Sequence, residues 1–240
     1  TIEQALDPSA ALIWEDEDSN VSIDWRMGDS EKIAGIFDGA AHVVRRDLVN
    51  NRVTPAFMEP RAAIASHDPG DDRLTLRLGC QSVHGMQAGL CQVLDIPAEK
   101  LRVIVPDMGG GFGARGGVYM EYPVLLAAAR ELGRPVRWTA SRSEGMLTDT
   151  QARDHVSKGE LALDSDGNFL ALRIRADWRH GAYLPSRSLW VTLHYMPPTI
   201  GGSYRLAEAD IGIRGIFSNS TPQSAYRGVG RAEGNYLLES

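Results

Sequence analysis

A β-branched strand, a glycine-rich loop and a helix follow one another between residues 101 and 132, and this succession constrains the fold more than any other part of the chain. The strand reads LRVIV, and the loop PDMGGGFGARGG contains a G-x-G-x-x-G pattern at Gly111, Gly113 and Gly116. A helix is predicted near residues 119–132, because its apolar positions recur at helical spacing and Gly133 supplies a stop. The strand PVRWTA follows, which predicts a β-loop-α-β unit.

The glycine pattern raises the possibility of a dinucleotide-binding turn, since backbone N–H groups before a helix attract phosphate. Three features argue against it. No acidic residue stands at the end of the second strand to bind a ribose, Phe112 occupies the place of the pyrophosphate, and a hairpin follows instead of a second crossover. Arg142 is compatible with a 2′-phosphate, so an NADP- or nucleotide-binding module remains the alternative. A tight turn without any ligand is the plainer alternative.

The rest of the chain predicts strands in hairpins beside this one crossover unit. Ser82 is expected to cap a helix from about His84 to Leu94 with Met86, Leu90, Val93 and Leu94 on one side, and Asp29 or Ser30 to cap a shorter one. Ser141 and Glu144 have the spacing of a capping box. Further strands are expected at 21–27, in HVVRRDLVNNR, FMEPRAAIASHD and LTLRLGC, in a hairpin turned at 164–167, and near 209–217. The predicted fold class is α+β (mixed α/β).

Composition excludes several functional classes. The net charge is 25 − 31 = −6, which argues against a general nucleic-acid surface. The longest apolar run, Val124–Ala129, is far too short to span a membrane, and the acidic N-terminus does not resemble a signal peptide. Cys80 and Cys91 provide neither a disulfide framework nor a metal quartet, so a cytoplasmic location is expected.

The ends of the chain suggest a piece of a longer polypeptide. It begins at Thr1 and stops within an expected helix, AEGNYLLES. Residues 1–20 are acidic and are interpreted as a linker or a tail from a preceding domain. Residues 21–240 are interpreted as one domain that is truncated at its C-terminal end.

Three separated strings, CQSVHGMQAGLCQVL, PDMGGGFGAR and QSAYRGVGRAEG, occur in an order that resembles the molybdenum hydroxylase family. This family contains the xanthine dehydrogenases, the aldehyde oxidases and the large chains of carbon monoxide dehydrogenases. FMEPRAAIA and the hairpin RDHVSKGELALDSDGNFLAL are also similar. The resemblance runs over nearly the whole chain and implies the first molybdenum-cofactor-binding domain of the large subunit.

The resemblance also implies cofactors, partners and a reaction. Molybdenum would be held by molybdopterin, as the cytosine dinucleotide, with no metal ligand from the protein. [2Fe-2S] and FAD are expected on partner domains or subunits, and the intact enzyme is expected to be an oligomer of heterotrimers. The small-molecule substrate would be oxidised with water as the oxygen source. The family's general-base glutamate and second cofactor-binding domain are not in this sequence, so the isolated chain is expected to be inactive.

Site residues carry over from the matching motifs. Gln81 matches a glutamine beside the molybdenum oxo group, with catalytic and cofactor-binding roles; its plainer interpretation is a helix cap. Gly110, Gly111, Phe112 and Gly113 match the loop under the metal. Phe112 matches an aromatic that also packs on the substrate, and otherwise it is a core residue. Arg227 matches a catalytic and cofactor-binding arginine, and otherwise it is half of an ion pair that closes a turn. The remaining predicted site residues are Gly228 beside the cofactor, and Tyr226 and Gly116 beside the substrate.

Two departures from the family pattern narrow the substrate. Copper-containing carbon monoxide oxidisers carry a cysteine where this chain has Gly228, and copper needs such a soft ligand. Purine-oxidising members carry a glutamate near Gly116, and glycine cannot orient a purine by hydrogen bonds. An aldehyde or an N-heterocycle is therefore expected. His84, His155 and His180 lack metal-ligand spacing and are interpreted as structural.

Overall fold

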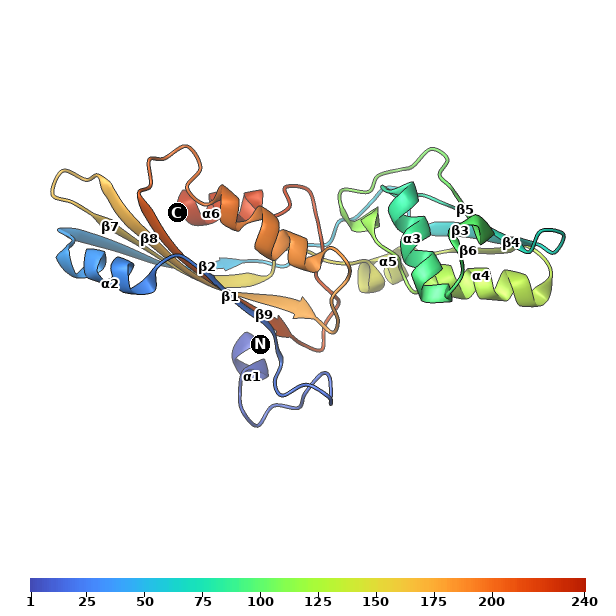
Figure 1. The fold of residues 1–240 in the computed structure, drawn as a ribbon, viewed down its shortest axis with the longest axis horizontal. Coiled ribbons are helices and arrows are strands. Elements are labelled where there is room, and N and C mark those ends of the chain that lie inside the picture. The colour runs from blue at the N-terminus through green and yellow to red at the C-terminus, as the bar shows by residue number, and fades with distance from the viewer.

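The computed structural model describes residues 1–240 and contains two lobes that lie side by side (Figure 1). The sheet lobe is formed by residues 1–50 and 155–240, and the inserted lobe by residues 62–140. The chain therefore leaves the sheet lobe once and returns to it once. The predicted α+β class is confirmed, with a five-stranded sheet in one lobe and a four-stranded sheet in the other.

The inserted lobe is a two-layer structure in which helices cover one face of a sheet. Its strands lie in the order β5 (Leu101–Ile104), β4 (Arg73–Leu78), β3 (Ala62–Asp68) and β6 (Val136–Thr139). Only the β4–β5 pair is parallel. Helices α3 (Val83–Leu94) and α4 (Glu121–Leu132) pack against the sheet, so the β-loop-α-β unit spans it from one edge to the other.

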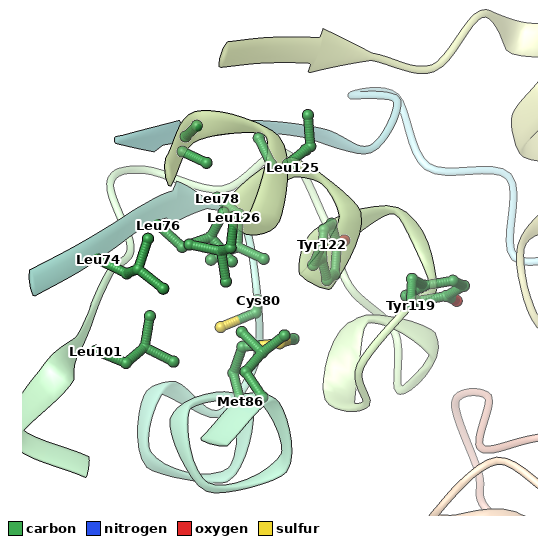
Figure 2. Close-up of a cluster of buried hydrophobic side chains, with 14 residues drawn as sticks. Leu74, Leu76, Leu78, Cys80, Met86, Leu101, Tyr119, Tyr122, Leu125 and Leu126 are labelled. Atoms are coloured by element: carbon green, nitrogen blue, oxygen red, sulfur yellow. The ribbon is translucent and has the colours of Figure 1, made fainter. Parts of the chain in front are cut away.

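Alternation along β4 explains how this layer packs. Leu74, Leu76 and Leu78 point inward while their neighbours are more exposed, as expected of a half-buried strand. They contact Met86 of α3 and Leu126 of α4 in one continuous core (Figure 2). Burial of each such side chain contributes about 1.5–3 kcal/mol.

The sheet lobe is built on β8, its central strand. The order is β1 (Val21–Met27), β9 (Glu208–Phe217), β8 (Phe169–Gly181), β7 (His155–Leu163) and β2 (His42–Asn50), with only β8–β9 parallel. α2 (Ser30–Gly39) covers one face, where Ile33 packs on Ala171. The segment 190–199 and α6 (Arg231–Leu238) cover the other. The two short helices α1 (Ile2–Ala5) and α5 (Arg142–Thr148) lie outside these layers.

Local signals in the sequence predicted most boundaries correctly. Asp29, Ser82 and Ser141 are N-caps that accept hydrogen bonds from the first turns of their helices, and Gly133 ends α4 in the left-handed region. Three predictions need correction. The strand expected from residue 57 begins at Ala62, and α4 begins at Glu121, not 119. Val93 is 61% exposed, because this side of α3 borders a cavity and not the core.

One further element borders the region between the lobes. Residues 190–195 form a short π-helical segment in a stretch rich in glycine and proline, where no helix was predicted. None of the helices combines the length and the apolar character needed to cross a lipid bilayer.

Candidate functional site

A cavity of about 1000 Å³ lies between the lobes and is lined by residues of both. The inserted lobe contributes the glycine loop and α3, and the sheet lobe contributes segments 183–195 and 224–231. Five predicted site residues line it: Gln81, Phe112, Gly113, Gly116 and Arg227. Gly110, Gly111, Tyr226 and Gly228 adjoin these residues in the two loops but are not among the lining residues.

The glycine loop adopts a conformation that side chains would block. Gly110 and Gly113 have φ of 105°, a region that residues with a Cβ rarely enter. A Cβ on Gly111 would lie 2.6 Å from Cγ of Gln81, and one on Gly113 would lie 2.7 Å from the carbonyl oxygen of Ala225. The glycines therefore let the loop backbone approach Gln81 on one side and the 224–228 loop on the other.

Gln81 is bound to this loop through one end of its side chain. Its Oε1 accepts a hydrogen bond of 2.8 Å from the backbone N–H of Gly113, and its own N–H donates to the Arg115 carbonyl. Ser82 is the N-cap of α3, so Gln81 is not the helix cap of its plainer interpretation. The Nε2 group is left to donate at the cavity, and an amide donates without a change of charge.

Arg115 fixes the start of the glycine loop. It is buried, and its Nη1 donates to Oε2 of Glu59 at 2.6 Å. Burial alone would raise the pKa of the Glu59 carboxyl. The hydrogen bonds from Arg115 and from the N–H of Gly109 outweigh this effect, so the pKa is lowered. The ion pair thus fixes the loop where it leaves β5.

Aromatic and cationic groups continue from this anchor into the cavity. The Arg115 guanidinium carbon lies 4.5 Å from the centre of the Phe57 ring, and Phe57 stacks on Phe112 at 6.2 Å between ring centres. Arg227, from the sheet lobe, lies 4.9 Å from the centre of the Phe112 ring. Phe112 is 37% exposed with φ of 49°, so it is not a core residue and its ring is presented at the cavity.

The loop that carries Arg227 is held by an ion pair whose carboxylate is buried. Arg153 donates to Oε1 of Glu233 at 2.5 Å and to the Arg227 carbonyl at 2.7 Å. Glu233 is completely buried, and Oε2 of its carboxylate has no partner. The Tyr226 ring packs against the Arg153 guanidinium at 5.5 Å. The Arg227 side chain itself is exposed and is not the ion-pair partner that its plainer interpretation requires.

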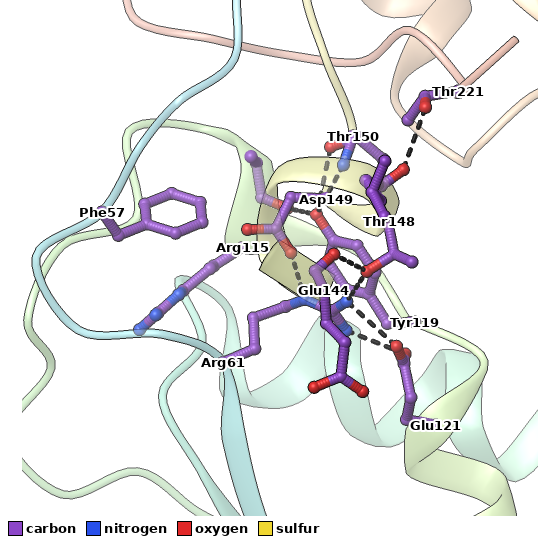
Figure 3. Close-up of polar contacts among 12 residues, drawn as sticks. Phe57, Arg61, Arg115, Tyr119, Glu121, Glu144, Thr148, Asp149, Thr150 and Thr221 are labelled. Carbon is purple, nitrogen blue, oxygen red and sulfur yellow. Dashed lines mark hydrogen bonds and ion pairs between the residues drawn. The ribbon is translucent and has the colours of Figure 1, made fainter. Parts of the chain in front are cut away.

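A second buried arginine joins residues 148–150, where the chain returns to the sheet lobe, to the end of the glycine loop (Figure 3). Arg61 donates to both carboxylate oxygens of Glu121 and also to Asp149, which raises the pKa of its guanidinium although burial opposes the charge. The Tyr119 ring lies 3.9 Å from the same guanidinium carbon, and its hydroxyl donates to the Ala114 carbonyl. Residues 148–150, the start of α4 and the end of the glycine loop therefore form one polar unit.

These contacts argue against the dinucleotide-binding alternative. Glu121, in the first turn of α4, is paired with Arg61, so a carboxylate already stands where a phosphate would bind. A separate turn, Ala114–Gly116, lies between the glycine loop and the helix. Arg142 donates to the carbonyl groups of Phe57 and Met58 and is not free for a 2′-phosphate.

Several residues of the site were not found by sequence reasoning. Glu59, Arg115, Arg153 and Glu233 act through partners distant in the chain, and Arg187 enters the cavity from the segment after β8. His155 and His180 are buried in β7 and β8, where burial lowers the pKa of each imidazole to about 4.

The chain resembles known proteins along nearly its whole length. The chain is 35% identical to the 6-hydroxypseudooxynicotine dehydrogenase complex subunit gamma of Paenarthrobacter nicotinovorans, over 98% of this chain and 30% of that protein. Quinoline 2-oxidoreductase from Pseudomonas putida 86 has a TM-score of 0.87 at 33% identity, covering 95% of this chain and 29% of its own. CO dehydrogenase from Oligotropha carboxidovorans has a TM-score of 0.91 at 30% identity, covering 100% and 32%.

The chain thus spans about a third of the length of these relatives. Residues 13–240 match the family model of the molybdopterin cofactor-binding domain. The match begins before residue 21, where the sequence interpretation placed the start of the domain. The resemblance to the molybdenum hydroxylases is confirmed, and the chain belongs to the molybdopterin cofactor-binding domain family.

Proposed function

We propose that this chain is part of the large catalytic subunit of a molybdenum-dependent hydroxylase that oxidises an aldehyde or an N-heterocycle with water as the oxygen source. The observation that carries the proposal is the meeting of Gln81, the Phe112 loop and Arg227 in one cavity between two lobes. These residues come from three separate segments, and the fold brings them together.

The residues present fit a molybdopterin cofactor. Gln81 offers a neutral donor at Nε2, and the close backbone approach at Gly111 and Gly113 leaves a surface without side chains. Backbone and amide donors of this kind suit the oxygen atoms of a metal centre and its pterin. When bound, the cofactor supplies the two-electron oxidation of a carbon centre with an oxygen atom from water.

The remaining roles belong to side chains at the substrate. Phe112 presents a flat apolar face against which an aromatic ring packs. The guanidinium of Arg227 stabilises negative charge that develops on the substrate. The proton acceptor and the opposite wall of the cavity are assigned to parts of the large subunit outside this chain, so the 240-residue chain alone is expected to be inactive.

Gly228 and Gly116 indicate which substrates the site does not oxidise. Gly228 offers no thiolate, and copper therefore lacks a soft ligand next to Arg227. Gly116 offers no hydrogen bond to a purine. Carbon monoxide and xanthine are therefore not the proposed substrates.

We extend the proposal to the complex. One relative is named as a subunit gamma of a complex, and electrons that leave the substrate require a route out of the large subunit. We assign that route to [2Fe-2S] and FAD on partner domains or subunits, with the pterin as the cytosine dinucleotide. An oligomer of heterotrimers in the cytoplasm is the proposed assembly.

The test is made on the full-length protein expressed with its neighbouring subunits and with molybdate in the medium. Molybdenum and copper are measured per chain, and dye reduction is followed with aldehydes, N-heterocycles and CO. We expect stoichiometric molybdenum, no copper, oxidation of an organic substrate and no response to CO. Bound NADP without molybdenum would overturn the proposal, and CO-dependent reduction with stoichiometric copper would overturn the substrate assignment.

A further inference from the structure

Arg187 fills the space that a side chain at position 116 would occupy. A Cβ placed on Gly116 would lie 2.7 Å from the guanidinium carbon of Arg187 and 2.9 Å from its Nε and Nη1. Gly116 itself is buried. The two residues come from different lobes, so the glycine of the inserted lobe gives room to the arginine of the sheet lobe.

The Arg187 guanidinium makes no hydrogen bond or ion pair with the protein, and no aromatic ring covers it. The two other arginines of the cavity each lie over an aromatic ring, Arg227 over Phe112 and Arg231 over Tyr195. Arg187 is only partly exposed. A half-buried guanidinium with its planar set of donors unused has lost part of its hydration without compensation, which favours binding of an anion.

The charge of the whole cavity points the same way. Its 25 lining residues include three arginines and neither an aspartate nor a glutamate. The chain as a whole carries a net charge of −6. A positive cavity in a negatively charged chain concentrates anions against the general field of the protein.

We propose that Arg187 is a specificity-determining residue that binds a carboxylate on the substrate, and that Gly116 permits this by leaving the space open. The proposal rests on the proposed function and narrows its substrate class to aromatic or heterocyclic compounds that carry a carboxylate. Arg187 and Phe112 line the same cavity, so a planar ring and an anionic substituent are accommodated together. Guanidinium and carboxylate match as a two-bonded pair, which fixes the orientation of the ring.

The experiment compares benzoate with benzamide, which have the same ring and nearly the same shape but differ in charge. Binding of each is measured by calorimetry on the full-length molybdenum-loaded protein and on Arg187→Gln, with Arg205→Gln as the control. Arg205 is an exposed arginine outside the cavity. We expect benzoate to bind about tenfold or more tightly than benzamide, and Arg187→Gln to weaken benzoate alone by about 10–100-fold, the range of a charge-assisted hydrogen-bonded pair.

Gly116→Ala supplies a second variant that keeps every charge. Its methyl group displaces the Arg187 guanidinium, so the preference for benzoate is expected to fall while benzamide binding changes less than twofold. Arg187→Lys is expected to retain part of the preference, because it keeps the charge but loses the planar pair of donors.

The outcomes separate this inference from the proposed function. Equal binding of benzoate and benzamide to the unmodified protein overturns the inference whether or not the variants fold. Loss of molybdenum and pterin phosphate from Arg187→Gln also overturns it, because Arg187 then binds the cofactor. If the unmodified protein contains no molybdenum but prefers benzoate through Arg187, the proposed enzymatic function fails while the carboxylate site stands.

Discussion

The guanidinium of Arg227 lies over the ring of Phe112, with 4.9 Å between its central carbon and the ring centre. One residue belongs to the sheet lobe and the other to the inserted lobe, so this contact joins the two loops that meet at the cavity. The position of the arginine therefore depends on an aromatic ring in the other lobe.

Phe112→Leu is expected to lower kcat/KM for aromatic substrates about tenfold, because the cation–π contact with Arg227, about 0.5–2 kcal/mol, and the stacking face for the substrate are both lost. The measurement is steady-state kinetics of the full enzyme. Phe169→Leu is the matched control, since Phe169 packs on Tyr204 outside the cavity. An equal loss in both variants would show that Phe112 serves only the stability of the fold.

Gln81→Ala is expected to lower kcat by about 10²–10³, the usual effect of removing one oriented donor from a reaction centre. Its melting temperature should change little, because Gln81 is exposed and Ser82 is the residue that caps α3. Gln4→Ala, at an exposed position of α1, is the control. A fall in melting temperature with kcat unchanged would assign Gln81 a structural role.

Arg153→Gln is expected to destabilise the protein by about 3–5 kcal/mol, because it leaves the completely buried carboxylate of Glu233 without its cation. It also removes the hydrogen bond to the Arg227 carbonyl. Glu233→Gln in the same chain should restore much of the stability. The measurement is the unfolding midpoint of the two single variants and the double variant. Additive losses in the double variant would contradict coupling of the pair.

The buried histidines predict a stability that falls in acid. Burial lowers the pKa of His155 and His180 to about 4, whereas unfolded histidine titrates near pH 6.5. Between these values the unfolded chain binds more protons than the folded one, so the contribution is complete above about pH 6.5 and is lost progressively down to about pH 4. Each histidine accounts for about 3 kcal/mol of this loss.

The measurement is the unfolding midpoint from pH 8 to pH 4, compared between the unmodified protein and His180→Gln. Lowered pKa values of carboxylates such as Glu59 act in the same direction at the acid end, and the comparison removes their shared effect. The variant should show the flatter profile. Parallel profiles would mean that His180 does not resist protonation in the folded state.

Local structure could be predicted where its determinants lie within a few residues. The side chains of the N-caps Asp29, Ser82 and Ser141 each accept a hydrogen bond from the backbone N–H three residues later. All three helices begin where the sequence indicated. The glycine loop was predictable for the same reason, because glycine is the residue that enters positive φ without strain.

The predictions that failed depend on contacts between residues that lie far apart in the chain. Val93 has the spacing of a core residue of α3, but only the approach of the second lobe decides that this side of the helix borders a cavity. The pairing of Arg61, Arg153 and Glu233 could not be predicted, since each has its partner far along the chain. Gly116 and Arg187 likewise become a pair only through the arrangement of the lobes.

The position of the inserted lobe also determines an order of folding. β2 pairs with β7 along its whole length, yet residues 51–154 are synthesised between these two strands. β1 pairs even later in synthesis, because its only partner strand is β9. The inserted lobe finds all its strand partners within residues 62–139 and closes shorter loops, which form faster. During synthesis it is therefore expected to fold first, with its glycine loop already shaped. The cavity wall that carries Arg187 and Arg227 is added only when the last strand of the sheet lobe emerges.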